Sequence, residues 1–263
     1  MPEPGTGLAL RLDGAVVLVT GGGRGVGAGI AASFRRAGAT VVTCGRTTPP
    51  APADEFIHCD VREPDQVSAL IDEIVARHGR LDVLVNNAGG SPPVPAADAS
   101  PRFSAGVLQL NLLAPLLVSQ AANAVMQRRA GGGAIVMVSS VSGRRPSPGT
   151  AAYGAAKAGL ENLTATLAVE WAPKVRVNAL AVGLVRTEQA HLHYGDEAGI
   201  AAVGATVPLG RLAEPAEVGA CAVFLASPLA SYVTGATLAV HGGGERPAFL
   251  AAATAQVPEG APA

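Results

Sequence analysis

Short apolar runs alternate with longer amphipathic stretches along the chain. Runs rich in β-branched residues predict strands at 15–20, 40–44, 55–59, 82–86, 134–139, 175–180 and 237–240. Apolar positions at helical spacing predict helices at 26–37, 64–78, 104–128, 152–171 and 215–226. Because alternating strands and helices form βαβ units, the pattern predicts an α/β fold with one doubly wound, mainly seven-stranded parallel sheet and helices on both faces.

The chain is long and apolar enough for one domain with a large core. It has 263 residues, of which 49% are hydrophobic, and no change of composition marks a linker before its end. We therefore expect a single domain over residues 1–245. The mixed, glycine-interrupted segment 185–208 predicts a mobile lid over a pocket, and the low-complexity segment 246–263 predicts a partly disordered tail.

The charge balance argues against a nucleic acid partner. Nineteen Lys and Arg residues stand against twenty Asp and Glu residues, so the chain lacks the positive excess that a phosphate backbone requires. The N-terminus lacks the basic start and apolar core of a secretory signal, and no apolar run reaches the ~18 residues that span a membrane. We expect a cytoplasmic protein with no membrane partner.

The histidines and cysteines show no metal-ligand spacing. Cys44, Cys59 and Cys221 are scattered, which predicts buried free thiols in a reducing compartment. His191 and His193 form a pair with no third ligand nearby. We expect no metal site, and we expect the two histidines to line a pocket.

A cluster of glycines lies between the first predicted strand and the first predicted helix. A helix that begins there presents free backbone N–H groups and the positive end of its dipole, which suit a diphosphate. The spacing is neither G-x-G-x-x-G nor that of a P-loop, and a glycine cluster alone also suits a simple turn. The position favours a dinucleotide cradle made by Gly21, Arg24, Gly25, Val26 and Gly27.

The end of the second predicted strand bears on the choice of cofactor. An acidic residue usually stands there when the ligand is NAD, whereas this chain has Gly45 followed by Arg46. An arginine suits the 2′-phosphate of NADP(H), and Arg24 favours the same choice. NADP(H) is therefore favoured and NAD(H) is the alternative, in which case both arginines are solvated surface residues.

Tyr153 and Lys157 stand one helical turn apart on the same face of a predicted helix. A nearby ammonium group lowers the pKa of a phenol, so this tyrosine suits proton transfer near neutral pH. Ser140 follows the fifth predicted strand, at the edge where open α/β sheets bind ligands. Asn111 lies in a Leu-rich helix, where an unpaired amide is costly. Taken alone, the Tyr153 and Lys157 pair also suits a purely structural role.

Together, these residues resemble the ordered motifs of the short-chain dehydrogenase/reductase family. The likeness rests on the glycine loop after Thr20, on Asp60-Val61, Asn86-Asn87-Ala88-Gly89, Asn111 and Ser140, and on Tyr153-x-x-x-Lys157, and it covers about residues 12–243. The resemblance implies a Rossmann-like fold and hydride exchange between a nicotinamide cofactor and an alcohol or ketone. One departure is Val182-Gly183, where the family usually has Pro-Gly.

The resemblance also implies roles for individual residues. Tyr153 would carry the proton, Lys157 would bind the nicotinamide ribose and tune the tyrosine, Ser140 would orient the substrate oxygen, and Asn111 would hold a water. The remaining residues that would border the cofactor are Asp60 and Val61 at the adenine, Asn87, Ala88 and Gly89 at the ribose, and Gly183, Val185 and Thr187 at the nicotinamide.

We therefore expect an NAD(P)-dependent oxidoreductase for secondary alcohols or ketones. The alternative is a catalytically idle dinucleotide-sensing protein on the same fold. The lid side chains Leu192, Tyr194, Ile200 and Val203 predict a bulky apolar substrate, of the cyclic, steroid-derived or acyl-thioester kind that relatives use, and Phe249 and Leu250 would add to its pocket or to a subunit contact. By resemblance we expect a homotetramer that pairs through the helices carrying Asn111 and Tyr153.

Overall fold

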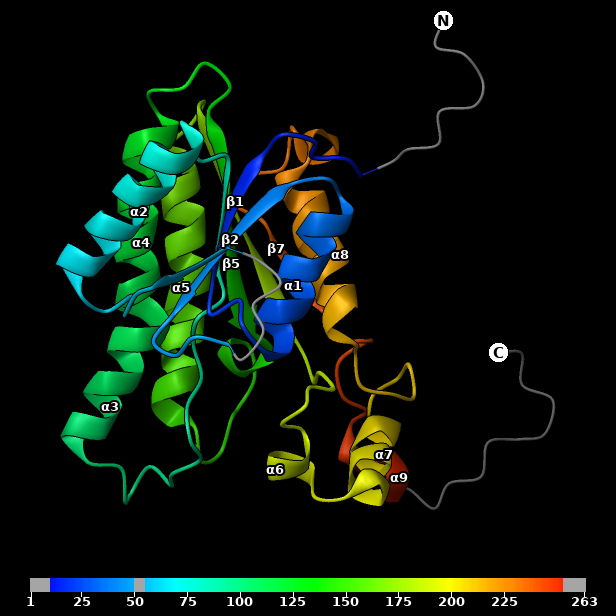
Figure 1. The fold of residues 1–263 in the computed structure, drawn as a ribbon. Helices are drawn as coiled ribbons and strands as arrows, with labels where there is room; N and C mark the ends of the chain where they lie inside the picture. The colour runs from blue at the N-terminus through cyan, green and yellow to red at the C-terminus, as the bar shows by residue number, and fades with distance from the viewer. Residues whose placement is uncertain (1–9, 50–54, 253–263) are drawn as a thin grey trace, which may run out of the picture.

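Seven parallel strands form one sheet in a computed structural model that describes residues 10–49 and 55–252. Their order is β3-β2-β1-β4-β5-β6-β7, which confirms the predicted fold class. The strands are β1 (Val16–Thr20), β2 (Thr40–Gly45), β3 (Glu55–His58), β4 (Val83–Asn86), β5 (Gly133–Ser140), β6 (Val175–Val182) and β7 (Thr237–Val240). Figure 1 shows their arrangement. The order reverses between β1 and β4, and ligands of doubly wound sheets bind at such a point.

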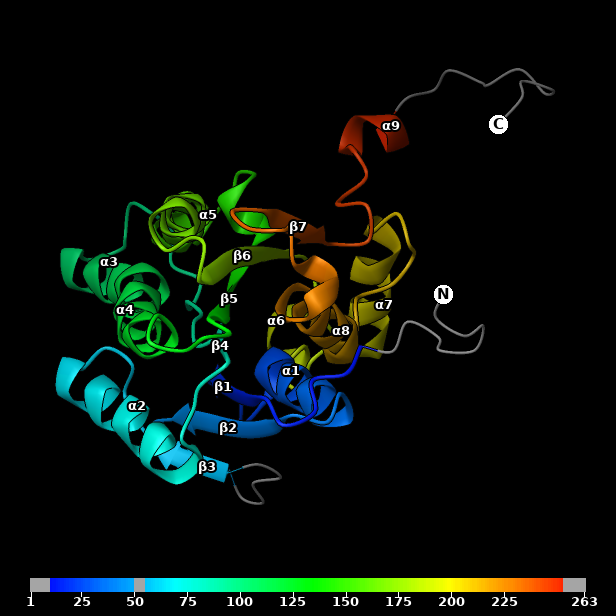
Figure 2. The same ribbon diagram turned by 90° about the horizontal axis from the view of Figure 1, so that it is seen from above.

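Helices cover both faces of the sheet, as Figure 2 shows from above. α1 (Gly25–Arg36) and α8 (Pro215–Ala226) pack against each other on one face, and α2 (Pro64–His78), α4 (Ala114–Met126) and α5 (Ala151–Glu170) cover the other. Side chains alternate along each strand. Val17 and Val136 therefore lie in the core on the face covered by α1 and α8, while Leu18 and Ile135 lie in the core on the opposite face. This burial on both faces explains the nearly continuous apolar runs.

The helix predicted at 104–128 consists of three parts. α3 (Pro101–Leu108) continues into a π-helical turn, η1 (Gln109–Leu113), and then into α4. By length and composition the whole stretch, Pro101–Met126, is apolar enough to cross a membrane. Here it lies in a helix layer, with α4 against α2 and α3 against α5.

The structure also differs from the expectation at β6, in the lid segment and in the C-terminal segment. β6 runs to Val182 rather than to Leu180, because Val182 pairs with both Ser140 and Val240. The segment 185–208 contains two short helices, α6 (His191–Tyr194) and α7 (Glu197–Thr206). A further helix, α9 (Ala248–Ala252), forms in the segment expected to be a disordered tail, whose residues 253–263 lie outside the described part.

Candidate active site

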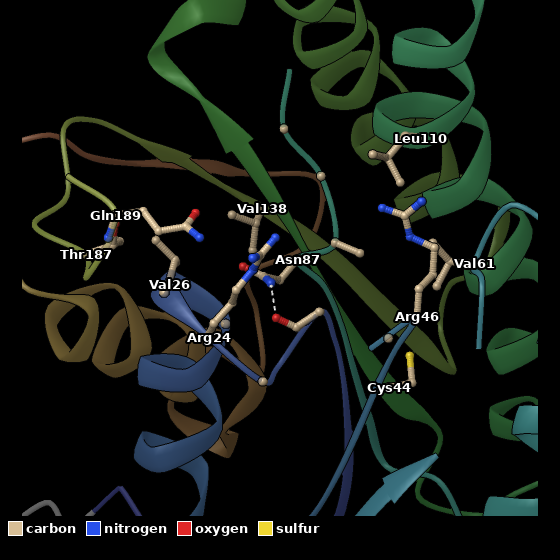
Figure 3. Close-up of a pocket in the computed structure, with 18 of the residues that line it drawn as sticks. Arg24, Val26, Cys44, Arg46, Val61, Asn87, Leu110, Val138, Thr187 and Gln189 are labelled. Atoms are coloured by element: carbon tan, nitrogen blue, oxygen red, sulfur yellow. Dashed lines mark hydrogen bonds between the residues drawn. The ribbon is translucent and has the colours of Figure 1, made fainter. Parts of the chain in front are cut away.

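A cavity of about 680 Å³ runs along the carboxyl ends of the strands. Figure 3 shows part of its lining, with Val26 from α1, Asn87 after β4 and Val138 from β5. Every predicted site residue except Asn111 lines it, namely Gly21, Arg24, Gly25, Val26, Gly27, Arg46, Asp60, Val61, Asn87, Ala88, Gly89, Ser140, Tyr153, Lys157, Gly183, Val185 and Thr187. The fold therefore gathers residues that are more than 160 positions apart in sequence into one site.

The glycine loop has a backbone conformation and an internal packing that side chains would prevent. Gly21 and Gly25 have φ angles of +64° and +54°, which favour glycine. A Cβ on Gly21 would lie 3.1 Å from the Ala88 Cα, and one on Gly27 would collide with the Gly21 carbonyl oxygen. The first turn of α1 has no acidic residue, and Arg24 provides no side-chain cap. The loop therefore fits the diphosphate of a dinucleotide.

The loops after β1 and β4 are bound to each other next to this cradle. Thr20 Oγ1 accepts hydrogen bonds from the backbone N–H groups of Asn87 and Ala88, each at 3.0 Å. In return Asn87 Nδ2 donates to the Thr20 carbonyl at 2.9 Å and to the Gly21 carbonyl at 3.1 Å. These contacts fix the floor of the cavity at the switch point of the sheet.

Positive charge collects at the end of the cavity beyond β2. Figure 3 shows the side chains of Arg24 and Arg46 extending into the cavity. Asp60 lines the same end, and its carboxylate accepts hydrogen bonds from Arg62 at 2.5 and 2.9 Å. This contact with Arg62 is the main reason that the pKa of Asp60 falls to about 2, and Arg46 contributes to the shift. Two guanidinium groups, those of Arg62 and Arg46, thus act on one carboxylate.

Ser140, Tyr153 and Lys157 meet at the other end of the cavity. Tyr153 and Lys157 lie in the first two turns of α5, with the Lys157 Nζ 5.5 Å from the centre of the tyrosine ring. Lys157 is buried and donates to the Val138 carbonyl at 2.7 Å, and burial lowers the pKa of its ammonium to about 8. The Ser140 hydroxyl accepts a hydrogen bond from the backbone of Ser142 at 3.2 Å.

The phenol of Tyr153 does not titrate as expected from the sequence. We expected Lys157 to lower its pKa, whereas burial raises the pKa and only the interaction with the Ser140 hydroxyl acts in the opposite direction. The Lys157 ammonium donates to the Val138 carbonyl and is not among the groups that shift this pKa. In this structure the tyrosine is therefore held in its protonated form.

Asn111 lies behind the cavity, in the π-helical turn, and is completely buried. Its Oδ1 accepts a hydrogen bond from Gly90 N–H at 2.8 Å, while its Nδ2 donates to the carbonyls of Gly90 and Val107, both at 2.9 Å. A Cβ on Gly89 would lie 2.7 Å from this Oδ1 and 3.4 Å from the Lys157 Nζ. The amide thus holds the loop after β4 against the reactive end of the cavity.

The departure at Val182 has a structural consequence. A proline there has no N–H for the ladder, whereas Val182 extends β6 and lies buried beside Val240. Gly183 then packs on His241, whose Cα lies 2.8 Å from the position of a Cβ on this glycine. Gly183, Val185 and Thr187 still line the cavity.

The lid residues are placed differently from the sequence expectation. Ile200 is buried with Ala190 and Leu212 in a small core of the lid itself, and Tyr194 and Val203 pack against that core. Leu192 is 68% exposed and Phe249 is 70% exposed, while the Leu250 side chain lies outside the described part. His191 and His193 are exposed as well, and His191 and Ile200 line a small, mostly charged cavity of about 310 Å³. The described lid side chains therefore do not form an apolar pocket wall here, although His191 lines a cavity as expected.

Two contacts between distant segments were not predicted from the sequence, because no motif or fixed spacing links the residues that form them. Glu188 Oε1 accepts a hydrogen bond from the backbone N–H of Gly25, 163 positions away, at 2.9 Å. Arg145, five positions after Ser140, pairs with Glu245 beyond β7 at 2.5 Å. Among the described residues, no group of three or more His, Cys, Asp or Glu side chains has the arrangement of a metal site.

The comparisons with known proteins agree with this geometry. A family model described as enoyl-(acyl carrier protein) reductase matches residues 21–245. The chain belongs to the short-chain dehydrogenase/reductase family. It is 40% identical over 248 residues to L-fucose dehydrogenase of Oryctolagus cuniculus, covering 89% of this chain and 86% of that protein. It is 37% identical over 245 residues to D-threitol dehydrogenase of Mycolicibacterium smegmatis, covering 89% and 94%.

A solved structure extends the likeness to three dimensions. The ligand-free aldohexose dehydrogenase of Thermoplasma acidophilum superposes with a TM-score of 0.85 at 33% identity, covering 96% of this chain and all of that one. This short-chain dehydrogenase is thus an oxidoreductase of the alcohol dehydrogenase type, and its family uses a nicotinamide cofactor, NAD or NADP.

Proposed function

We propose that this enzyme transfers a hydride between NADP(H) and the carbon of a secondary alcohol or ketone. The observation that carries the proposal is the single cavity whose one end is the glycine cradle and whose other end holds Ser140, Tyr153 and Lys157. When bound, the nicotinamide supplies or accepts the hydride. Residues 1–245 are proposed as the catalytic domain, with the lid included.

Four side chains divide the remaining work in this proposal. Tyr153 gives a proton to the ketone oxygen in reduction, or takes it from the alcohol in oxidation, and Ser140 holds that oxygen by a hydrogen bond. Lys157 binds the nicotinamide ribose, and a turn of its ammonium from the Val138 carbonyl toward the phenol makes the phenolate less costly to form. Asn111 positions the loop after β4, since its side-chain amide is fully bonded to Gly90 and Val107.

The preference for NADP(H) rests on the positive end of the cavity. Arg24 and Arg46 reach toward the place of the adenosine, and Arg62 neutralises Asp60 there. A 2′-phosphate carries the charge that these groups bind, whereas the 2′-hydroxyl of NAD(H) does not. Asp60 and Val61 would border the adenine.

For the substrate we propose a polyhydroxylated alcohol or its ketone. Arg145 and Glu245 form an ion pair near Tyr194. Arg145 follows β5 and Glu245 follows β7. The last residues of these two strands, Ser140 and Val240, both pair with Val182 of β6. A charged pair beyond the ends of these strands offers hydrogen-bond donors and acceptors that suit the hydroxyl groups of a substrate. The named relatives act on L-fucose, D-threitol and aldohexoses. A bulky apolar substrate has less support, because Ile200 and Val203 fill the core of the lid.

The assembly proposed is a cytoplasmic homotetramer. Leu113 in η1 and Val169 in α5 are 55% and 80% exposed, which suits pairing through the helices that carry Asn111 and Tyr153. The experiment for this point is light scattering on an eluting size-exclusion peak. A monomeric mass would reject it.

The first test of the activity is a titration with NADPH and NADH, followed by nicotinamide fluorescence. The proposal expects tighter binding of NADPH, and it fails if neither dinucleotide binds. A substrate panel then compares polyols and sugars with cyclic apolar alcohols and ketones at the preferred cofactor. Turnover of the apolar group alone would overturn the polyhydroxylated class. Binding without any turnover would favour the alternative, an idle dinucleotide sensor.

A further inference from the structure

The lid places a carboxylate on the glycine cradle. Glu188 Oε1 lies 2.9 Å from the backbone nitrogen of Gly25, the first residue of α1. Glu188, Thr187 and Gln189 all line the cavity. Figure 3 shows Thr187 and Gln189 beside Val26, at the first turn of this helix. The contact therefore joins the start of the lid to the place where a diphosphate would bind.

Helix α1 has no group of its own that could bind its first N–H groups in place of the Glu188 carboxylate. Its first turn contains no acidic residue and Arg24 caps none of its N–H groups with a side chain. An anion near the N-terminus of a helix is stabilised by the free N–H groups and by the dipole. Glu188 is exposed, so burial of its own side chain does not explain its position.

We propose that Glu188 occupies the diphosphate site of the empty enzyme and competes with the cofactor. This inference rests on the function proposed above. The Gly25 N–H cannot donate fully to two anions at once, and a carboxylate beside a diphosphate is repelled by it. Cofactor binding therefore has to displace Glu188, and the energy of the lost contact weakens the apparent affinity.

Displacement of Glu188 also acts on the lid. The N–H of Ala190 donates to the carbonyl of Thr187 at 3.0 Å, and Ala190 is buried in the lid core with Ile200 and Leu212. A movement of Glu188 is thus passed to this core through a two-residue connection. Binding of the dinucleotide therefore releases the lid before the alcohol binds. In this way Glu188 couples occupation of the cofactor site to access to the substrate site.

The decisive variant is Glu188→Gln, which removes the charge and keeps the shape. Glu197→Gln is the matched control, since Glu197 is a lid carboxylate that pairs with Arg186 instead. Dissociation constants for NADPH and NADH are measured at low salt. An anion at a helix N-terminus contributes about 0.3–1 kcal/mol, so Glu188→Gln should bind both dinucleotides about twofold to fivefold more tightly. The control should stay close to wild type.

Hydrogen exchange of peptides from 185–208 supplies an independent readout without cofactor. The proposal expects faster exchange of this segment in Glu188→Gln than in wild type or Glu197→Gln. Unchanged or weaker dinucleotide binding by Glu188→Gln would overturn the proposal, and so would unchanged exchange. Failure of the wild type to bind either dinucleotide would instead reject the proposed function, so the two failures are distinguishable.

Discussion

Thr20 and Asn87 each bind the other's backbone. The Thr20 hydroxyl accepts from the Asn87 N–H at 3.0 Å, and the Asn87 amide donates to the Thr20 carbonyl at 2.9 Å. The two residues end β1 and follow β4, neighbouring strands at the switch point of the sheet. This reciprocal pair makes the floor of the cofactor cavity rigid before any ligand arrives.

Replacing Thr20 by Val should weaken the fold. The change keeps the shape but leaves the Ala88 N–H without its acceptor and the Asn87 N–H with only the Val85 carbonyl, at 3.1 Å, which should lower the free energy of unfolding by about 1–3 kcal/mol. Urea unfolding measures this. Thr20→Ser is the control and should lose about 1 kcal/mol or less, because it keeps the hydroxyl. Equal losses in both variants would contradict the argument.

Two glycine substitutions should have opposite effects on stability. In Gly27→Ala the new Cβ collides with the Gly21 carbonyl, so we expect the melting temperature to fall by several degrees and dinucleotide binding to be lost. A Cβ on Gly106, inside α3, meets no atom within 4 Å. Gly106→Ala should therefore stabilise the protein by about 0.5–1 kcal/mol. Thermal melts of both variants measure these effects. An unchanged melting temperature in Gly27→Ala would contradict the close packing of Gly27 against the Gly21 carbonyl.

Tyr153→Phe should separate binding from chemistry. The phenol is the proton donor in the proposed reaction, so its removal should lower kcat about 100-fold to 10,000-fold. The dissociation constant of NADPH should change little, because the ring and its neighbours stay in place. Steady-state kinetics and the fluorescence titration check the two parts. Full turnover by this variant would show that another group moves the proton.

Lys157 should give the stability of the enzyme a pH dependence. Its pKa is about 8 in the folded protein, against an ordinary value of 10.5, so between these values the unfolded chain binds more protons. The free energy of unfolding then gains up to about 1.4 kcal/mol per pH unit as the pH rises from 8 to 10.5, and below pH 8 this gain is absent. Lys157→Met should remove this part of the slope. Chemical unfolding of both proteins across the range measures the difference, and identical slopes would contradict the burial of a charged lysine.

Arg46→Ala should change the choice of cofactor. Loss of a guanidinium that binds a phosphate removes about 1.5–3 kcal/mol, so NADPH should bind about 10-fold to 150-fold more weakly. NADH lacks the 2′-phosphate, and its binding should change less than threefold on the same argument. Arg128→Ala, at an exposed position after α4, is the control. An equal loss of affinity for NADPH and NADH would mean that Arg46 does not bind the 2′-phosphate.

The sequence was sufficient to predict the strands and most of the cavity lining. The inner strands are buried on both faces, so their apolar runs stand out, and parallel strands bring their carboxyl ends to one edge. The effect of Val182 on the length of β6 depends on partners in two neighbouring strands, which a linear pattern does not contain. The contact of Glu188 with Gly25 and the rise in the pKa of Tyr153 both depend on three-dimensional proximity and burial.

The π-helical turn at Gln109–Leu113 constrains how this region can change. A π turn holds one residue more than an α turn, and one residue corresponds to about 100° of rotation around a helix axis. The wider π turn takes up the extra residue locally, so α3 and α4 keep nearly the rotation they would have in one continuous α-helix. Deletion of a single residue there would restore a regular α-helix without turning α3 away from α5, but it would remove the widened turn in which Asn111 bonds Gly90. The extra residue therefore serves the local placement of Asn111, although the sequence of this stretch reads as an ordinary leucine-rich helix.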